Sequence, residues 1–265
     1  YNCYKFWIPY CLKLCDLVKD SFSISLNASD WGHDTFLSMT STITTNIIPD
    51  EYSMIESKVI NSDSIPLNYS IFKNEWLNRE SIVFWRGSTT GSYFDSLEDL
   101  QKLLRIRACL TFKNVVGFDL KVTSIVQNNI PKKLVGQWLK ERNILASPVD
   151  EDTFKNYKYH LDISGNNTDC CSWGVIRKFL RGNLVFKTNH MSQMYYDRYL
   201  EPWIHFIPVE ADFNDLNEKY CWAEENQAEA ALISWRGLCV ARKYLSSLQE
   251  EFIDVAKIHL QLFKS

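Results

Sequence analysis

A hydroxyl-rich loop bounded by glycines follows a short apolar stretch at residues 81–85. The loop consists of Arg86, Gly87, Ser88, Thr89, Thr90 and Gly91. An arginine fork can hold a phosphate by two parallel hydrogen bonds, glycines let the backbone approach closely, and hydroxyls donate to phosphate oxygens. The pattern therefore indicates phosphate binding. It is not a P-loop, because no Lys-Ser or Lys-Thr follows in the required frame, and a plain strand-to-helix loop explains it about as well.

A second polar cluster extends from Asp162 to Arg177. Asp162 can accept hydrogen bonds from sugar hydroxyls, and Gly165 and Asn166 suit a turn with positive φ. Ser172 and the amides after it can face a diphosphate, because the first turn of a helix has unpaired N–H groups. The alternative is a helix cap that binds nothing, followed by a solvated basic face made of Arg177, Lys178 and Arg181.

A carboxylate in an early loop is a candidate general base. Asp30 lies within Asn-Ala-Ser-Asp-Trp-Gly-His-Asp, just after a predicted strand, and an acid at a loop rim can remove a proton from a hydroxyl. His33 and Asp34 are nearby alternatives, and an ordinary Asx turn explains the segment without any chemistry. His205, in an apolar stretch, is better explained as a structural histidine.

Hydrophobic periodicity and breakers predict the elements that position these groups. We expect strands at 21–27, 36–45, 81–85 and 119–126, and an irregular interdomain connection at 49–80. We expect helices at 1–20, 97–109, 132–142, 227–245 and 248–263, with Asn214 as the N-cap of another. The stretch 159–208 fits strand, glycine turn, helix 175–181 and strand. Strands alternating with helices predict an α/β fold with a mostly parallel sheet.

Composition excludes several classes of protein. A net charge of −3 over 265 residues gives no electrostatic reason to expect nucleic-acid binding. The sequence also contains no run of about 18 apolar residues that would predict a membrane-spanning helix. The eight cysteines contain no Cys-x-x-Cys pair, which argues against zinc and for reduced, mostly buried thiols in a cytoplasmic protein. A secretory-pathway protein is the alternative. Nine tryptophans suit a large aromatic core, or stacking on sugar or base rings.

The same stretches, in this order, resemble the glycosyltransferase family 90 domain, which includes protein O-glucosyltransferases, capsule-associated xylosyltransferases and lipopolysaccharide-modifying enzymes. The resemblance extends from about residue 80 to 245. The matching pieces are Phe84-Trp-Arg-Gly-Ser-Thr-Thr-Gly, Tyr157-Lys-Tyr-His-Leu-Asp-Ile-Ser-Gly-Asn, Ser172-Trp, Leu180-Arg-Gly-Asn-Leu-Val-Phe-Lys and Tyr195-Tyr-Asp-Arg-Tyr-Leu-Glu-Pro-Trp-Ile-His-Phe-Ile-Pro-Val. The last piece is the most specific.

The resemblance implies a GT-B architecture of two Rossmann-like halves, with the active site in the cleft between them. We expect a short or incomplete acceptor-side half at 1–75, a donor-binding half at 76–245 and a C-terminal helix at 246–265. The resemblance also implies inverting sugar transfer from a UDP-sugar with no metal and no other cofactor. In that scheme Asp30 is the base, Trp31 stacks on the acceptor sugar, and the donor diphosphate is held by Arg86, Gly87, Ser88, Thr89, Thr90, Gly165, Asn166, Ser172 and Trp173.

Two departures from the family pattern matter. Animal members carry Ser-x-Arg where this chain has Ser172-Trp173-Gly174, so Arg177, one helical turn later, is the expected substitute. The segment before residue 80 is also shorter than a full acceptor-side domain. The Ser-Trp form resembles the bacterial members.

The favoured function is transfer of glucose or xylose to a lipopolysaccharide or capsule hydroxyl, at the inner face of the membrane and without a transmembrane segment. The alternatives are a protein O-glucosyltransferase acting on Ser and a non-catalytic sugar-nucleotide-binding domain.

Overall fold

The computed structural model describes residues 7–18, 26–27, 37–38, 40–41, 47–56, 68–165, 174–188 and 193–264. Its centre is a parallel sheet with the strand order β5-β4-β6-β7-β9. The strands are β4 Glu80–Ser88, β5 Phe118–Ser124, β6 Tyr157–Asp162, β7 Leu184–Thr188 and β9 Ile207–Val209. The predicted α/β class with a parallel sheet is confirmed.

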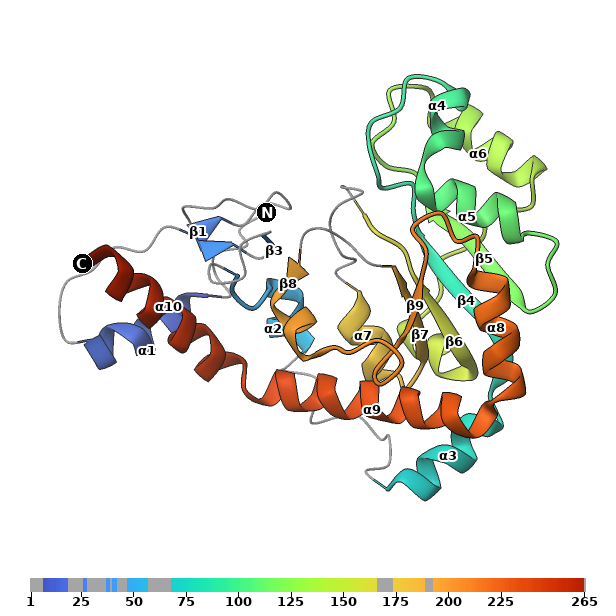
Figure 1. Ribbon diagram of the computed structural model, residues 1–265. Helices are drawn as coiled ribbons and strands as arrows, with labels where there is room; N and C mark the ends of the chain where they lie inside the picture. Colours follow the sequence, from blue (N-terminus) through green and yellow to red (C-terminus); the bar gives the residue numbers. More distant parts are fainter. Residues whose placement is uncertain are drawn as a thin grey trace.

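Helices pack around this sheet, except for the last one along the chain, which extends away from it (Figure 1). They are α3 Tyr69–Leu77, α4 Leu97–Lys102, α5 Leu104–Phe112, α6 Lys132–Glu141, α7 Val175–Leu180, α8 Leu216–Glu225, α9 Gln227–Ser246 and α10 Leu248–Lys264, with the 3-10 helices η4 Glu151–Asn156 and η5 Tyr195–Tyr199. In Figure 1, α9 runs below the sheet, while α4, α5 and α6 gather beyond β4 and β5. The predicted strand–helix–strand of residues 159–208 and the two long C-terminal helices are confirmed.

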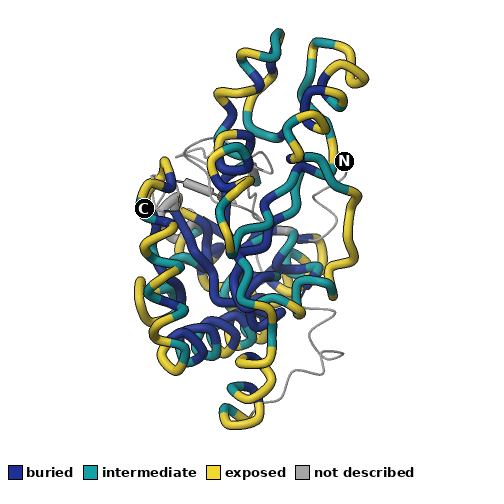
Figure 2. The backbone as a smooth tube through the Cα atoms, turned by 90° about the vertical axis from the view of Figure 1, so that its right-hand side faces the viewer, coloured by how far each residue is buried: buried dark blue, intermediate teal, exposed yellow. Residues whose placement is uncertain are grey.

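Side chains alternate between the two faces of β6, as the pleat of a strand requires. Tyr159 packs edge-on against Trp76 of α3 and also contacts the ring of Phe186. The next residue, His160, stacks on Phe154 of η4 instead. Figure 2 shows the resulting buried core as the dark blue tube of the central strands, enclosed by helices with exposed outer turns. The sheet therefore has a sealed aromatic face and a second face that carries polar groups.

The N-terminal part that the structure describes consists of short elements. These are α1 Ile8–Val18, α2 Glu51–Glu56 and the two-residue strands β1 Leu26–Asn27, β2 Leu37–Ser38 and β3 Thr40–Ser41. β1 pairs with β2, and β3 pairs antiparallel with β8 Gln193–Met194. In Figure 1, α1 lies beside α10. No helix in the described ranges is both long and apolar enough to cross a membrane.

The prediction of an irregular connection at 49–80 is wrong where the structure describes it. Asn68 begins α3, since its side-chain oxygen accepts from the backbone N–H groups of Ser70 and Ile71 at 2.9 and 3.3 Å. Asp50 accepts from the backbone and hydroxyl of Ser53 in α2 at 2.9 and 2.6 Å. Asn, Asp and Ser suggested a loop, but here they stabilise the first turns of helices. α3 crosses the predicted domain boundary at 75/76 and packs on α9; the division into domains stays a prediction.

Three smaller predictions are also wrong. The helix expected at 97–109 is broken at Leu103, whose extended backbone separates α4 from α5. Asn214 does not cap α8, because its side chain donates to Asp212 and the helix begins after Asp215. The strand expected to end at residue 85 continues to Ser88, so half of the predicted loop belongs to β4.

The expectation of mostly buried thiols also fails for the cysteines described as free. Cys109 is buried, and burial raises its pKa to about 12. Cys15, Cys221 and Cys239 are exposed. An exposed free thiol does not contribute to a core, so only Cys109 acts as the small buried hydrophobe that composition suggested.

α9 and α7 approach each other closely at a glycine. A Cβ built on Gly237 of α9 would lie 2.6 Å from Cδ1 of Phe179 in α7 and 2.8 Å from the carbonyl oxygen of His205. Only a residue without a side chain leaves room for that contact. Gly237 therefore sets the position of α7, which carries several charged residues described below.

We predict that Gly237→Ala lowers the free energy of unfolding by about 1–3 kcal/mol, because the added methyl overlaps a ring and a backbone carbonyl. Gly136→Ala in α6 is the matched control, since a Cβ there meets only Ile125 Cδ1 at 3.7 Å. The control should be neutral or stabilising by up to about 1 kcal/mol through helix propensity. Denaturant unfolding measures both, and equal effects at the two positions would contradict this account of Gly237.

Candidate functional site

The strand order creates a switch point between β4 and β6. The chain leaves β4 for β5 on one side of it, and leaves β6 for β7 on the other. Loops after the two strands therefore diverge, and in open α/β sheets ligands bind in the crevice that this leaves at the carboxyl ends. In this chain those ends are Ser88 and Asp162.

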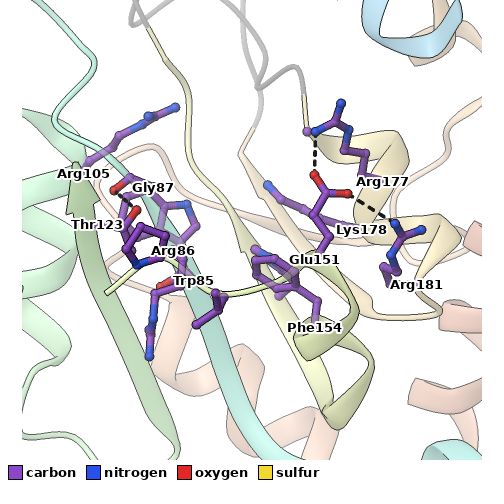
Figure 3. A pocket seen from close by; sticks show the side chains of 14 residues that line it. Trp85, Arg86, Gly87, Arg105, Thr123, Glu151, Phe154, Arg177, Lys178 and Arg181 are labelled. Carbon is purple, nitrogen blue, oxygen red and sulfur yellow. Dashed lines mark hydrogen bonds and ion pairs between the residues drawn. The ribbon is translucent and has the colours of Figure 1, made fainter. Parts of the chain in front are cut away.

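A cavity of about 300 Å³ lies beside this switch point. In Figure 3 the labelled side chains form two groups, one from β4, β5 and α5 and one from η4 and α7. Cationic side chains dominate the lining, and Glu151 is its one acid among the described residues. The residues that line it are Trp85, Arg86, Gly87, Arg105, Thr123, Pro148, Val149, Glu151, Phe154, His160, Gly174, Arg177, Lys178 and Arg181.

Arg105 of α5 joins the ends of β4 and β6. Its Nε donates to the carbonyl of Ser164 at 2.9 Å, and Nη1 lies 3.3 Å from both the carbonyl and the hydroxyl of Ser88. Burial lowers its pKa to about 10, so the guanidinium is still charged at neutral pH. Arg105 forms no ion pair with any described carboxylate. The sequence analysis missed it, because it lies inside the predicted helix 97–109 and belongs to none of the polar motifs.

Arg86 occupies a different position from the one predicted. It lies within β4, where Nη2 pairs with Asp119 at 2.5 Å and Nη1 donates to the backbone carbonyl of Asp119 at 2.9 Å. Its guanidinium also covers the ring of Phe84, 4.1 Å from the centroid. Arg86 lines the cavity, but most of its donors are used within the fold. A phosphate would therefore have to compete with Asp119 for it.

The hydroxyl groups of the loop 86–91 differ in whether the fold already uses them or a ligand could reach them. Thr89 is fully buried; its hydroxyl donates to the carbonyl of Val126 at 2.7 Å and accepts from the N–H of the same residue at 2.9 Å. The prediction that Thr89 donates to a phosphate is therefore wrong. Ser88 and Thr90 share a hydrogen bond with each other at the end of β4. Gly87 is needed locally, because a Cβ there would lie 2.4 Å from the ring of Trp85.

Asp162 is also more buried than the sequence indicated. Its side chain is fully buried at the end of β6 and forms an ion pair with Lys178 of α7. Burial lowers the pKa of Lys178, and the Asp162 carboxylate opposes that shift. The predicted contact of Asp162 with sugar hydroxyls is wrong for this arrangement, since the carboxylate has no exposed surface. Its role is to balance a buried ammonium group.

Arg177 and Arg181 of α7 converge on Glu151 (Figure 3). Arg177 Nη1 lies 2.7 Å and Arg181 Nη2 3.3 Å from the Glu151 carboxylate, and Arg177 Nε lies 2.6 Å from Glu56 of α2. Burial raises the pKa of Glu56, while the charge of Arg177 opposes the rise. The alternative of a solvated basic face is therefore wrong. These arginines join α7 to η4 and α2 at the edge of the cavity.

The structure brings the two predicted glycine-containing segments together. A Cβ built on Gly165 would lie 3.4 Å from Nη2 of Arg105 and 3.8 Å from Cγ2 of Thr90. The loops after β4 and β6 therefore meet around Arg105, as the prediction of one shared site requires. Five other predicted site residues lie outside the described ranges: Asp30, Trp31, Asn166, Ser172 and Trp173.

His160 is a cavity-lining residue that the sequence analysis did not select. Its ring stacks on Phe154 with centroids 4.8 Å apart, and Nδ1 lies 3.0 Å from the carbonyl oxygen of Leu161. Burial, and then the neighbouring Lys178 cation, hold its pKa well below the ordinary value of 6.5. The imidazole is therefore neutral at physiological pH. His205, expected to be structural, accepts from the N–H of Glu201 at 3.0 Å.

The family model for glycosyl transferase family 90 matches residues 53–260, which include the whole sheet and every described group of the cavity. The chain belongs to glycosyl transferase family 90. The match begins within α2 and ends within α10, so it covers part of α2 and all of α3, which lie in the segment where we had expected an irregular connection.

Several relatives are similar to this family 90 chain. Protein O-glucosyltransferase 2 of Danio rerio is 26% identical over 162 residues, which are 61% of this chain and 28% of that protein. Protein O-glucosyltransferase 3 of Homo sapiens is 34% identical over 94 residues, which are 36% and 18% of the two chains. Uncharacterized protein 179R of Invertebrate iridescent virus 6 is 27% identical, with 64% and 16% covered. The chain therefore spans less than a third of the length of each.

Solved structures of glycosyltransferases are more distantly similar. The glycosyltransferase of Rickettsia africae has a TM-score of 0.45 at 12% identity, covering 79% of this chain and 55% of that chain. Anabaena HepE in complex with UDP and glucose has a TM-score of 0.39 at 14% identity, with 75% and 52% covered.

We predict that acid destabilises this family 90 chain through His160. Its folded-state pKa is depressed, so the unfolded chain binds the proton more tightly, and stability falls as the pH drops below about 6.5. The slope should reach about 1.4 kcal/mol per pH unit relative to His160→Gln, which cannot be protonated. Unfolding of both proteins between about pH 7.5 and 5.5 measures this difference. Parallel curves would contradict it.

Proposed function

We propose that this chain binds the donor in a glycosyltransferase that uses a UDP-sugar, with the diphosphate at the ends of β4 and β6. The observation that carries the proposal is Arg105, a partly buried, charged guanidinium at the switch point that forms no ion pair with any described carboxylate. Partial burial disfavours this cation, and the Asp162 carboxylate, which attracts it, is already paired with Lys178. An anionic ligand would give Arg105 an ion pair of its own. Membership of glycosyl transferase family 90 supports a sugar nucleotide as that anion.

The surrounding groups suit a diphosphate. Ser88 and Thr90 have hydroxyls that can exchange their mutual hydrogen bond for a phosphate oxygen. Gly165 lies against Arg105 and leaves room for a ligand beside the guanidinium. Positive charge from Arg86 and Lys178 adds to the field without a direct contact. Together these groups would stabilise the negative charge that develops on a leaving UDP.

Arg177 is the residue expected to replace the missing family arginine. Its guanidinium is already held by Glu56 and Glu151, so a diphosphate contact would require Glu151 to move aside. Glu151 is about half exposed, which makes that exchange inexpensive. We therefore place Arg105 first and Arg177 second as diphosphate ligands.

The catalytic step in this proposal is inversion at the anomeric carbon. Asp30 would remove the proton of an acceptor hydroxyl as its oxygen attacks and UDP departs, with Trp31 against the acceptor sugar. Glucose or xylose is the proposed donor sugar. We propose that no metal takes part, with the cationic side chains named above stabilising the leaving group.

The acceptor has two candidates. The first is a glycan hydroxyl of lipopolysaccharide or capsule, which the bacterial-like Ser172-Trp173 segment favours. The second is a Ser hydroxyl of a protein, which the names of the Danio rerio and human relatives favour. Release of UDP in the presence of each acceptor class distinguishes them.

We predict that Arg105→Gln weakens UDP binding by about 10- to 100-fold, the effect of losing charge-assisted hydrogen bonds to a diphosphate. Arg107→Gln is the matched control, because Arg107 is exposed on the same helix two residues later. Calorimetry measures binding, and thermal unfolding without UDP verifies that both variants fold. A folded Arg105→Gln variant with wild-type affinity would overturn the diphosphate site.

We predict that Asp30→Asn binds UDP as the wild type does but transfers at least about 100-fold more slowly, because the amide cannot accept the proton. Transfer from UDP-glucose and UDP-xylose to both acceptor classes is the readout. Retained turnover would reject Asp30 as the base. A wild-type chain that binds UDP and transfers to neither acceptor class would favour the non-catalytic alternative.

A further inference from the structure

His160 lies on the polar face of β6, next to Phe84 of β4 in the strand register. It lines the cavity from the middle of the sheet, below the diphosphate groups at the strand ends. The proposed chemistry has not used it. It is a buried, polar, neutral side chain in a cavity whose other polar liners are mainly charged.

The hydrogen bond of Nδ1 determines which nitrogen is available to a ligand. The carbonyl of Leu161 can only accept, so Nδ1 must carry the hydrogen and donate it. In a neutral imidazole the other nitrogen, Nε2, is then an acceptor. No described residue donates to Nε2. The ring therefore presents one free lone pair.

The neighbours of His160 keep it in that form. Phe154 lies along one side of the ring and restrains it through stacking. Burial and the Lys178 cation oppose protonation most strongly and Arg86 opposes it further, while the Asp162 carboxylate acts in the other direction without reversing the shift of the pKa. A carboxylate at this position would also accept a hydrogen bond, but its negative charge would repel an anionic ligand. The neutral imidazole accepts a hydrogen bond without that repulsion. It suits a neutral hydrogen-bond donor that forms part of an otherwise anionic ligand.

We propose that His160 is a specificity-determining residue, which accepts through Nε2 a hydrogen bond from an N–H or O–H group of the bound sugar nucleotide. This inference rests on the proposed function. Two parts of a UDP-sugar carry such a donor: the imide N–H of the uracil ring and the hydroxyls of the sugar. Both are neutral, and both belong to a ligand whose charge lies at the diphosphate.

Two variants separate the roles of the two nitrogens. The amide of His160→Asn can take the place of Nδ1 and keep the bond to Leu161, but it does not reach the position of Nε2. The longer His160→Gln places an amide oxygen near Nε2 and so keeps an acceptor for the ligand. We expect His160→Asn to weaken binding about tenfold, because a donor of the ligand is left unpaired. We expect His160→Gln to bind almost as tightly as the wild type.

Titration calorimetry of UDP and of UDP-glucose against wild type and both variants tests the proposal, with unfolding curves to verify folding. Loss in His160→Asn for both ligands assigns the contact to the base, and loss for UDP-glucose alone assigns it to the sugar; either result supports the proposal. Equal binding by all folded proteins, or equal loss in both variants, overturns the acceptor role and leaves the proposed function intact. If wild type binds neither ligand, the proposed function itself fails, and with it the role of His160.

Discussion

The Arg105 guanidinium is the contact on which the site depends. It hydrogen-bonds to the backbone at the ends of both β4 and β6, the strands between which the connections diverge. Diverging loops would otherwise leave those strand ends without a common partner. A single partly buried cation joins them through carbonyl oxygens, which are dipoles and do not neutralise its charge. The same contact therefore organises the crevice and leaves it electropositive.

Charge balance around the cavity sets Arg105 apart. Arg86 is paired with Asp119, Lys178 with Asp162, and Arg177 with both Glu56 and Glu151. Each of these pairs joins two elements, and breaking the buried Lys178–Asp162 pair would cost several kcal/mol, about 3–5. Among the lysines and arginines that line the cavity in the described ranges, only Arg105 forms no ion pair, although the Asp162 carboxylate attracts it from beyond ion-pair distance. An entering anion can therefore bind there without displacing an ion pair.

Much of the fold was predictable because local patterns and tertiary packing agree. The apolar stretch 184–188 becomes a buried strand, and the periodic stretches 227–245 and 248–263 become long helices. Prediction failed where the same residue types serve two purposes. Asn68 and Asp50 resemble loop residues but cap helices, and Leu103 lies inside the predicted helix 97–109 but ends α4. In those places capping and backbone geometry outweighed composition.

The sequence by itself determined that strands and helices alternate, that residues 86–91 and 162–165 lie at or near the ends of strands, and that the chain resembles family 90. Local spacing is enough for these, because turns and periodicity depend on residues close in the chain. Only the tertiary structure decided which polar groups face the cavity and which are consumed by partners. Asp119 is 33 residues from Arg86, and Ser164 is 59 from Arg105. Whether a charged side chain is free for a ligand depends on such distant partners, and no local pattern records them.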